Sequence, residues 1–162
     1  MDPIQAIGIQ EIGLRLGMAV FVGGILGLNR ELHQKPAGLR THALVTLGAA
    51  IITISSLNFT DDGHITHPDA LSRVIQGIIT GVGFLGAGVI IRDATGIQVH
   101  GLTTAATVWC AASLGVVCGL GYWRFLGLSA AALMLVLIVG GPIERISIKY
   151  LRKWVLGEKE DR

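Results

Sequence analysis

Apolar residues in this chain gather into long runs and do not alternate with polar ones. Five such runs cover about residues 12–28, 41–59, 74–91, 102–120 and 125–143. About 20 mainly apolar residues in a helix cross the roughly 30 Å of hydrocarbon in a bilayer. The pattern therefore predicts an all-α polytopic membrane protein with about five transmembrane helices. A soluble bundle is disfavoured, because these runs leave almost no polar face for water.

Basic residues are distributed unevenly between the two sides of the predicted bundle. If the N-terminus lies outside the cytoplasm, ten of the thirteen lysines and arginines fall on the cytoplasmic side. These are Arg30, Lys35, Arg40, Arg92, Arg145, Lys149, Arg152, Lys153, Lys159 and Arg162. Short cytoplasmic loops carry an excess of Lys and Arg. The sequence therefore predicts an N-out, C-in orientation in a lipid bilayer.

The C-terminal segment differs from the runs before it. Residues 1–142 make up the predicted transmembrane domain, and residues 143–162 form a basic amphipathic cytoplasmic tail. In the tail, apolar residues such as Ile146 and Tyr150 fall near one helical face, and basic residues gather on the other. Such a helix is typical of an anchor on an anionic leaflet, and docking to a partner protein is the alternative.

Composition restricts the functions to consider. Charged residues make up 15% of the chain, and its mean hydropathy is +0.63. A net charge of +2 provides no basic surface for nucleic acid. The sequence contains no phosphate-binding loop, no HExxH motif and no nucleophile–base arrangement. Neither enzymatic activity nor a cofactor is expected, and Cys110 and Cys118 are interpreted as apolar fillers.

Glycines concentrate in the third apolar run, where residues 77–90 contain five of them. The glycines spaced for helix packing are Gly23, Gly27, Gly77, Gly81, Gly83, Gly86 and Gly88. Such spacings let helices approach closely in lipid; the alternative is an unwound segment whose carbonyls line an ion or solute path. These surfaces exceed what five short helices bury among themselves. We therefore expect a homodimer that Gly83→Leu or Gly86→Leu disrupts.

Polar residues cluster at the predicted cytoplasmic ends of the spans. They are Asn29, Arg30, Glu31, Lys35, Arg40, Thr41, His42, Arg92, Asp93, Thr103 and Thr104. The cluster is either positive-inside decoration with threonine helix caps or a site for an anion, a proton or a partner. Because Arg40 is unfavourable at a helix start, we expect it to pair with Glu31 or Asp93. Two carboxylates among so many basic residues do not favour a magnesium cage.

A second polar group lies in the predicted outer loop. Its members are Asp61, Asp62, His64, His67 and Asp69. Histidines three residues apart can share a transition metal or sense acidic pH. No cysteine reinforces the set, so a solvated turn is the preferred interpretation.

Two short segments of the chain are similar to each other. Residues 38–45 align with residues 101–108, and each segment opens a span that runs outward from the cytoplasm. Each also follows a glycine-rich span that runs inward. The similarity suggests a parallel repeat of two hairpins. A chance match among helix starts rich in small residues is the alternative.

Four motifs follow one another in a fixed order. They are Leu28-Asn29-Arg30-Glu31, Lys35-Pro36-Ala37-Gly38-Leu39-Arg40-Thr41-His42, Gly83-Phe84-Leu85-Gly86-Ala87-Gly88-Val89-Ile90 and Gly101-Leu102-Thr103-Thr104-Ala105-Ala106. With them, residues 13–140 resemble the MgtC/SapB family of membrane proteins. The resemblance implies a bacterial inner-membrane protein associated with magnesium homeostasis, growth in low magnesium and virulence. The family's motif positions fall on Arg30, Glu31, Lys35, Pro36, Arg40, Thr41, His42, Arg73, Gln76, Gly83, Gly86, Gly88, Thr103 and Thr104.

The chain departs from the family pattern in two places. Asn29 stands where many members carry a glutamate, and many members continue into a cytoplasmic C-terminal domain that this short form is expected to lack. Two functions remain open. The first is a non-enzymatic regulator or scaffold that binds another membrane protein or a second copy of itself. The second is a small ion or solute transporter with a polar cytoplasmic gate. Ionisable groups are scarce in the middle of the spans, which favours the regulator.

Overall fold

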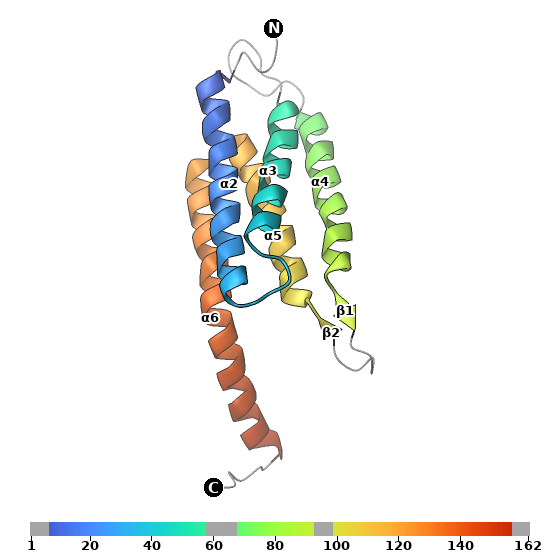
Figure 1. The fold of residues 1–162 in the computed structure, drawn as a ribbon, viewed down its shortest axis with the longest axis vertical. Coiled ribbons are helices and arrows are strands. Elements are labelled where there is room, and N and C mark those ends of the chain that lie inside the picture. Colours follow the sequence, from blue (N-terminus) through green and yellow to red (C-terminus); the bar gives the residue numbers. More distant parts are fainter. Residues whose placement is uncertain (1–6, 58–67, 93–98, 157–162) are drawn as a thin grey trace. The chain divides into compact units, whose positions relative to one another are not determined.

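The computed structural model describes residues 7–57, 68–92 and 99–156, and its elements are shown in Figure 1. The helices in these residues are α2 (Ile9–Leu32), α3 (Leu39–Ser55), α4 (Pro68–Gly88), α5 (Leu102–Leu120) and α6 (Trp123–Leu156). Between α4 and α5, strand β1 (Ile91–Arg92) pairs antiparallel with β2 (Val99–His100). The all-α membrane architecture is confirmed, and the two-residue strands are a feature that the apolar pattern does not predict.

Within the described ranges, four helices are long and apolar enough to cross a membrane: α2, α4, α5 and the part of α6 up to Ile143. Helix α3 has 17 residues and is the shorter one. At 1.5 Å per residue it extends about 26 Å, which is close to the hydrocarbon thickness of a bilayer. The N-out, C-in orientation and the parallel repeat stay predictions.

The chain divides into two compact units, Met1–Gly127 and Leu128–Arg162. The first contains α2 to α5 and the start of α6, and the second contains the rest of α6. Helix α6 continues through Pro142. A proline inside a helix removes one backbone hydrogen bond, and membrane helices accommodate this. Position 142 therefore lies within a helix, and the predicted division between domain and tail is not marked by a break in secondary structure.

Glycines, and not threonines, stand at the starts of α3 and α5. Gly38 is the N-cap of α3 and Gly101 that of α5, and neither cap makes a side-chain hydrogen bond. The interpretation of Thr41, Thr103 and Thr104 as caps is therefore wrong, because all three lie inside the first turn of their helices. Gly101 has a φ of 90°, a left-handed conformation that glycine adopts without steric cost.

Close glycine contacts place α3 between α2 and α5. Gly23 and Gly27 of α2 face α3, and so do Gly115 and Gly119 of α5. A Cβ added at any of these four positions would lie less than 3.0 Å from an atom of α3 or its N-cap. Helices that approach this closely are held in lipid by van der Waals packing. Helix α4 packs mainly on α5 and less on α3.

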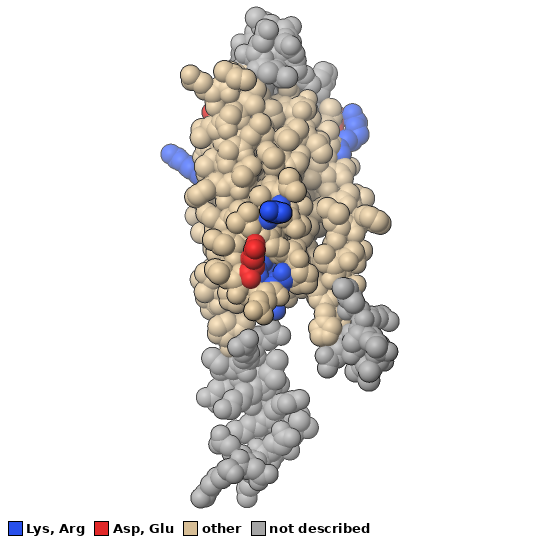
Figure 2. Space-filling view, in the orientation of Figure 1, with Lys and Arg blue, Asp and Glu red and all other residues tan. Residues whose placement is uncertain are grey.

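The side chains that the structure describes on the surface are largely apolar. Phe84 is 81% exposed and Leu128 is 73% exposed, whereas Thr46 and Thr53 are completely buried. Figure 2 shows few charged groups on the visible face. Apolar side chains outside and hydroxyl groups inside suit a bilayer, where buried polar groups bond across helices.

Candidate functional site

The loop between α2 and α3 is shaped by backbone hydrogen bonds and one carboxylate. The carbonyl of Arg30 accepts from the N–H groups of His33 (3.2 Å) and Lys35 (3.0 Å), which turns the chain at the end of α2. Glu31 Oε2 accepts the N–H of Leu39 at 3.0 Å. A carboxylate at a helix N-terminus satisfies a free N–H and interacts favourably with the helix dipole. Glu31 therefore caps α3 from the neighbouring helix.

This use of Glu31 changes the predicted ion pair. Among the described residues, the one ion pair joins Glu11 and Arg15, so Arg40 is not paired with Glu31. The prediction placed a carboxylate at the start of α3 correctly but gave it the wrong partner, because Glu31 bonds a backbone N–H. Asp93, the other proposed partner of Arg40, lies outside the described residues.

The exposed half of the cluster surrounds a cavity. Its volume is about 510 Å³, and it is lined by Glu31, Lys35, Pro36, Gly38, Leu39, Arg40 and Thr41. In Figure 2, basic and acidic groups lie close together on the otherwise tan face. A cavity with two cations, one carboxylate and the start of a helix can receive a charged group from solution or from a partner protein.

The buried half of the cluster joins three helices. Arg30 is 5% exposed, and its Nη2 donates to Thr104 Oγ1 of α5 at 3.2 Å. His42 is completely buried, and its Nδ1 lies 3.0 Å from the carbonyl of Gly38. Arg30 Nε and His42 Nε2 are buried without a hydrogen-bond partner. Arg30, His42 and Thr104 thus form a polar core where α2, α3 and α5 meet.

The other predicted members of the cluster are distributed as follows. Thr103 is exposed, and Asn29 is half-buried with its backbone carbonyl 2.7 Å from His33 Nδ1. The backbone of Arg92 pairs with Val99 in the hairpin. Asp93 lies outside the described residues, as do Asp61, Asp62, His64 and His67 of the outer loop. Asp69 lies in the first turn of α4. Within the described residues there is no group of three metal-binding side chains.

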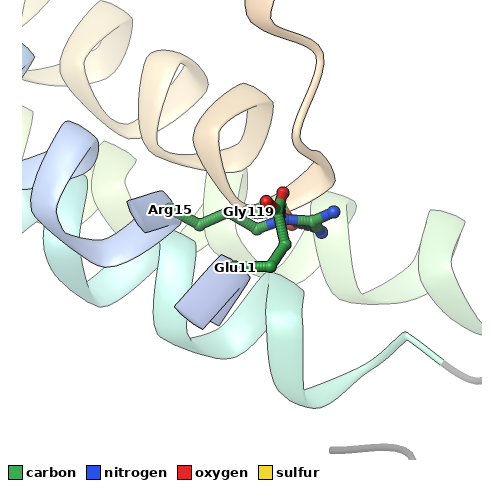
Figure 3. Close-up of polar contacts among 3 residues, drawn as sticks. All are labelled: Glu11, Arg15 and Gly119. Carbon is green, nitrogen blue, oxygen red and sulfur yellow. Dashed lines mark hydrogen bonds and ion pairs between the residues drawn. The ribbon is translucent and has the colours of Figure 1, made fainter. Parts of the chain in front are cut away.

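A charged contact between the start of α2 and the end of α5 was not predicted. Arg15 Nε bonds Glu11 Oε1 at 2.9 Å, and Arg15 Nη1 donates to the carbonyl of Gly119 at 2.8 Å (Figure 3). Gly121 follows in a left-handed conformation, with φ 74°, directly over the guanidinium. The cation thus satisfies a free carbonyl at the end of α5, and the Glu–Arg spacing of four residues was the signal for it.

Buried threonines were also missed. Thr46 Oγ1 lies 2.7 Å from the carbonyl of Ala19, so this hydroxyl bonds across the contact between α2 and α3. Thr107 Oγ1 donates to the carbonyl of Thr104 at 2.8 Å within α5. Small polar residues inside an apolar run are a known signal of helix contacts in membranes. Thr46, a polar residue within the apolar run 41–59, was therefore a sequence signal for the contact between α2 and α3.

Helix α4 carries the second candidate feature, an apolar groove between α3 and α4 of about 630 Å³. Gly77 and Gly81 line it from α4, and Gly48 lines it from α3. A Cβ at any of these three glycines, or at Gly83, would meet no other atom within 4 Å. Only apolar or small side chains line the groove, so it suits an apolar occupant.

The sequence profile of the MgtC family matches residues 16–146. The chain belongs to the MgtC family. It is 47% identical to Protein MgtC of Salmonella typhimurium (strain LT2) over 111 residues, covering 68% of this chain and 44% of that protein. It is 42% identical to Protein SrpB of Synechococcus elongatus over 135 residues, covering 80% of this chain and 74% of that protein. No solved structure matches the chain.

Family membership confirms the resemblance found in the four motifs. The match includes the polar cluster, the groove and most of α6, while Glu11 and Arg15 precede it. The chain spans less than half the length of the MgtC relative from Salmonella. What that whole protein does is therefore a matter of proposal for this chain.

Proposed function

We propose that the protein is a non-enzymatic regulator or scaffold of the bacterial inner membrane, linked to magnesium homeostasis, growth in low magnesium and virulence. Membership of the MgtC family and the names of the MgtC relatives support the proposal. In this reading the protein acts by binding other membrane proteins, including a second copy of itself, and not by chemical catalysis.

The observation that carries this proposal is the difference between two sets of glycines. The glycines of α2 and α5 that face α3 are in close contact with atoms of the same chain. In contrast, Gly77, Gly81 and Gly83 of α4 face open space. Glycine surfaces of the first kind show how this protein joins helices. These open positions on α4 offer the same close approach to a helix from another molecule. Gly77 and Gly81 lie on one side of α4, and Gly83 lies on nearly the opposite side, because each residue turns the helix by about 100°.

A second copy of the chain is the proposed occupant. An isologous dimer brings the same surface of both subunits together, so an α4 surface can pair with itself. From Val74 to Gly88 this helix contains no charged side chain, so two copies can meet in lipid without burying charge. Gly86 differs from the open glycines, because its Cβ would lie 3.6 Å from Ala105 Cβ of α5. Gly83 therefore tests the dimer more directly than Gly86.

The first experiment measures the mass of the purified protein in detergent and in lipid nanodiscs. Gly83→Leu is expected to convert the dimer to a monomer. Gly17→Leu is the matched control, because it adds the same bulk to an open glycine of α2 and should leave the mass unchanged. An unchanged mass in Gly83→Leu contradicts a dimer through the Gly83 side of α4.

A complementation assay tests the cellular role. A bacterial strain without this gene is expected to grow poorly in low magnesium, and wild type and Gly17→Leu should restore growth. Gly83→Leu should not, although it is present in the membrane at the wild-type level. Normal growth of the deletion strain in low magnesium would remove the link to magnesium.

A transporter with a cytoplasmic gate is the second candidate, and the cavity at Lys35 and Arg40 favours it. The test is flux of Mg²⁺, K⁺, H⁺ and phosphate into proteoliposomes, with Arg40→Ala as the comparison. Flux that is lost in Arg40→Ala would establish the transporter. No flux of any of these ions through correctly folded protein would support the regulator.

A further inference from the structure

Two side chains in the polar core each leave one buried atom without a partner. Arg30 Nε and His42 Nε2 make no hydrogen bond, although Arg30 is 5% exposed and His42 is 0% exposed. Buried polar atoms in folded proteins are nearly always bonded to protein or to ordered water. Each of these two atoms therefore needs a polar partner other than the side chains and backbone groups described above.

The two atoms belong to the same junction of helices. Arg30 extends from α2 and reaches Thr104 of α5, and His42 extends from α3. Gly27, one turn before Arg30, packs on the backbone of Gly38, whose carbonyl also receives His42 Nδ1. The start of α3 therefore lies beside the turn of α2 that carries Arg30.

The hydrogen bond to Gly38 decides what His42 offers to a ligand. A carbonyl oxygen can only accept, so His42 Nδ1 carries the proton. In the neutral ring, Nε2 then presents a lone pair and accepts a hydrogen bond. Arg30 Nε–H can only donate. The ligand must therefore accept from one side and donate to the other.

One acceptor on His42 and one donor on Arg30 restrict the kind of ligand that can bind both. A metal cation could bind the His42 lone pair, but the adjacent Arg30 charge repels it. An anion would suit Arg30 but would face the lone pair of His42, unless the ring took up a second proton. A hydroxyl group meets both requirements without any change in charge. We propose that one buried water molecule accepts the Arg30 Nε–H and donates an O–H to His42 Nε2, linking α2 to α3.

The site is independent of the proposed regulatory function, since a regulator and a transporter could both contain it. It adds a link between α2 and α3 to the direct Arg30–Thr104 bond between α2 and α5. At this junction, α2 and α3 would thus be joined through solvent as well as through glycine packing.

Solid-state NMR of the full chain in liposomes, with ¹⁵N-labelled histidine, tests the proposal. His42→Asn assigns the His42 signals by their loss. In the wild type, His42 is expected to have a protonated Nδ1 and a bare Nε2 that receives magnetisation from water. Arg30→Lys keeps the charge but lacks Nε–H, and it should reduce this water transfer severalfold. Exposed His33 reports bulk water and should not change.

Three results would overturn the water site. The first is a protonated Nε2 with a bare Nδ1 in His42. The second is no transfer from water to His42 Nε2 while His33 receives it normally. The third is a saturable shift of the His42 signals on addition of chloride or phosphate, which would assign the site to an anion. Once His42→Asn has assigned the signals, each of these results is read on the wild-type protein, so the test stands even if Arg30→Lys does not fold.

Discussion

Gly27→Ala tests whether the contact between α2 and α3 depends on the missing side chain. The added Cβ would lie 2.5 Å from the Cα of Leu39, 2.6 Å from the carbonyl oxygen of Gly38 and 2.8 Å from the nitrogen of Leu39. All three are backbone atoms at the start of α3 and cannot rotate away. To restore an ordinary contact of 3.4 Å, the two helices must separate locally by about 0.9 Å.

The magnitude follows from two opposing effects. Overpacking against backbone costs about 3 kcal/mol at the upper end of its usual range. Replacing glycine by alanine inside a helix returns about 1 kcal/mol. Gly27→Ala should therefore lower the free energy of unfolding by about 2 kcal/mol, and the melting temperature by roughly 4–8 °C. Gly24→Ala is the matched control on the same helix, because its Cβ would meet nothing within 4 Å.

The assay is thermal unfolding in detergent, followed with a dye that fluoresces on reaction with a thiol. Cys118 is completely buried in α5, so it reacts only when the bundle opens. A Cys110→Ala background leaves Cys118 as the one thiol, since the chain contains two cysteines. Gly24→Ala should melt at or slightly above the wild-type temperature. If Gly27→Ala melts as high as Gly24→Ala, the close contact does not exist as described.

Two further predictions use the same preparations. Glu31→Ala should destabilise the protein by about 1 kcal/mol, because the N–H of Leu39 loses its acceptor. Glu31→Gln keeps an acceptor and should therefore lose less stability. Equal melting temperatures of the two variants would argue against the cap. In native wild-type protein, a maleimide should label half-buried Cys110 at least about tenfold faster than buried Cys118. Peptide mass spectrometry measures the two labelling rates. Equal rates would contradict the burial of Cys118.

The spans could be predicted because membrane insertion imposes length and apolarity on each helix separately. The predicted run 102–120 coincides with α5, whereas the run 74–91 covers most of α4 but misses its first turns. The hairpin of β1 and β2 could not be predicted, since two-residue strands depend on the positions of the helices that they connect. Pro142 suggested a change of element, yet α6 continues past it because one lost backbone bond does not end a helix.

The polar cluster was predicted as a set, because consecutive spans place their ends on the same side. Its division into exposed and buried halves depends on the rotation of each helix, which a short apolar run does not reveal. Arg30 and His42 point into the bundle, while Lys35 and Arg40 line the open cavity. The choice of Glu31 as a cap depends on its distance to the N–H of Leu39, and only the loop geometry sets this distance.

Gly101→Ala and Gly38→Ala compare equivalent positions of the proposed repeat. Gly38 has a φ of −105°, which alanine adopts freely, and its Cβ would meet the flexible side chain of Glu31 at 2.9 Å. Gly101 has a φ of 90°, and its Cβ would collide with the backbone carbonyl of Val89. The left-handed conformation alone costs alanine about 1–2 kcal/mol, and the backbone collision adds to it.

Gly101→Ala should therefore melt several degrees below Gly38→Ala in the thiol assay. Equal melting temperatures would mean that the turn before α5 relaxes as easily as the turn before α3. The expected difference has a consequence for the repeat. Both glycines begin a helix, but a Cβ at Gly101 would meet the backbone of Val89 at the end of α4, whereas a Cβ at Gly38 would meet the side chain of Glu31. If the two hairpins form a repeat, they differ at this turn, and Gly101 is needed for a reason that Gly38 does not share.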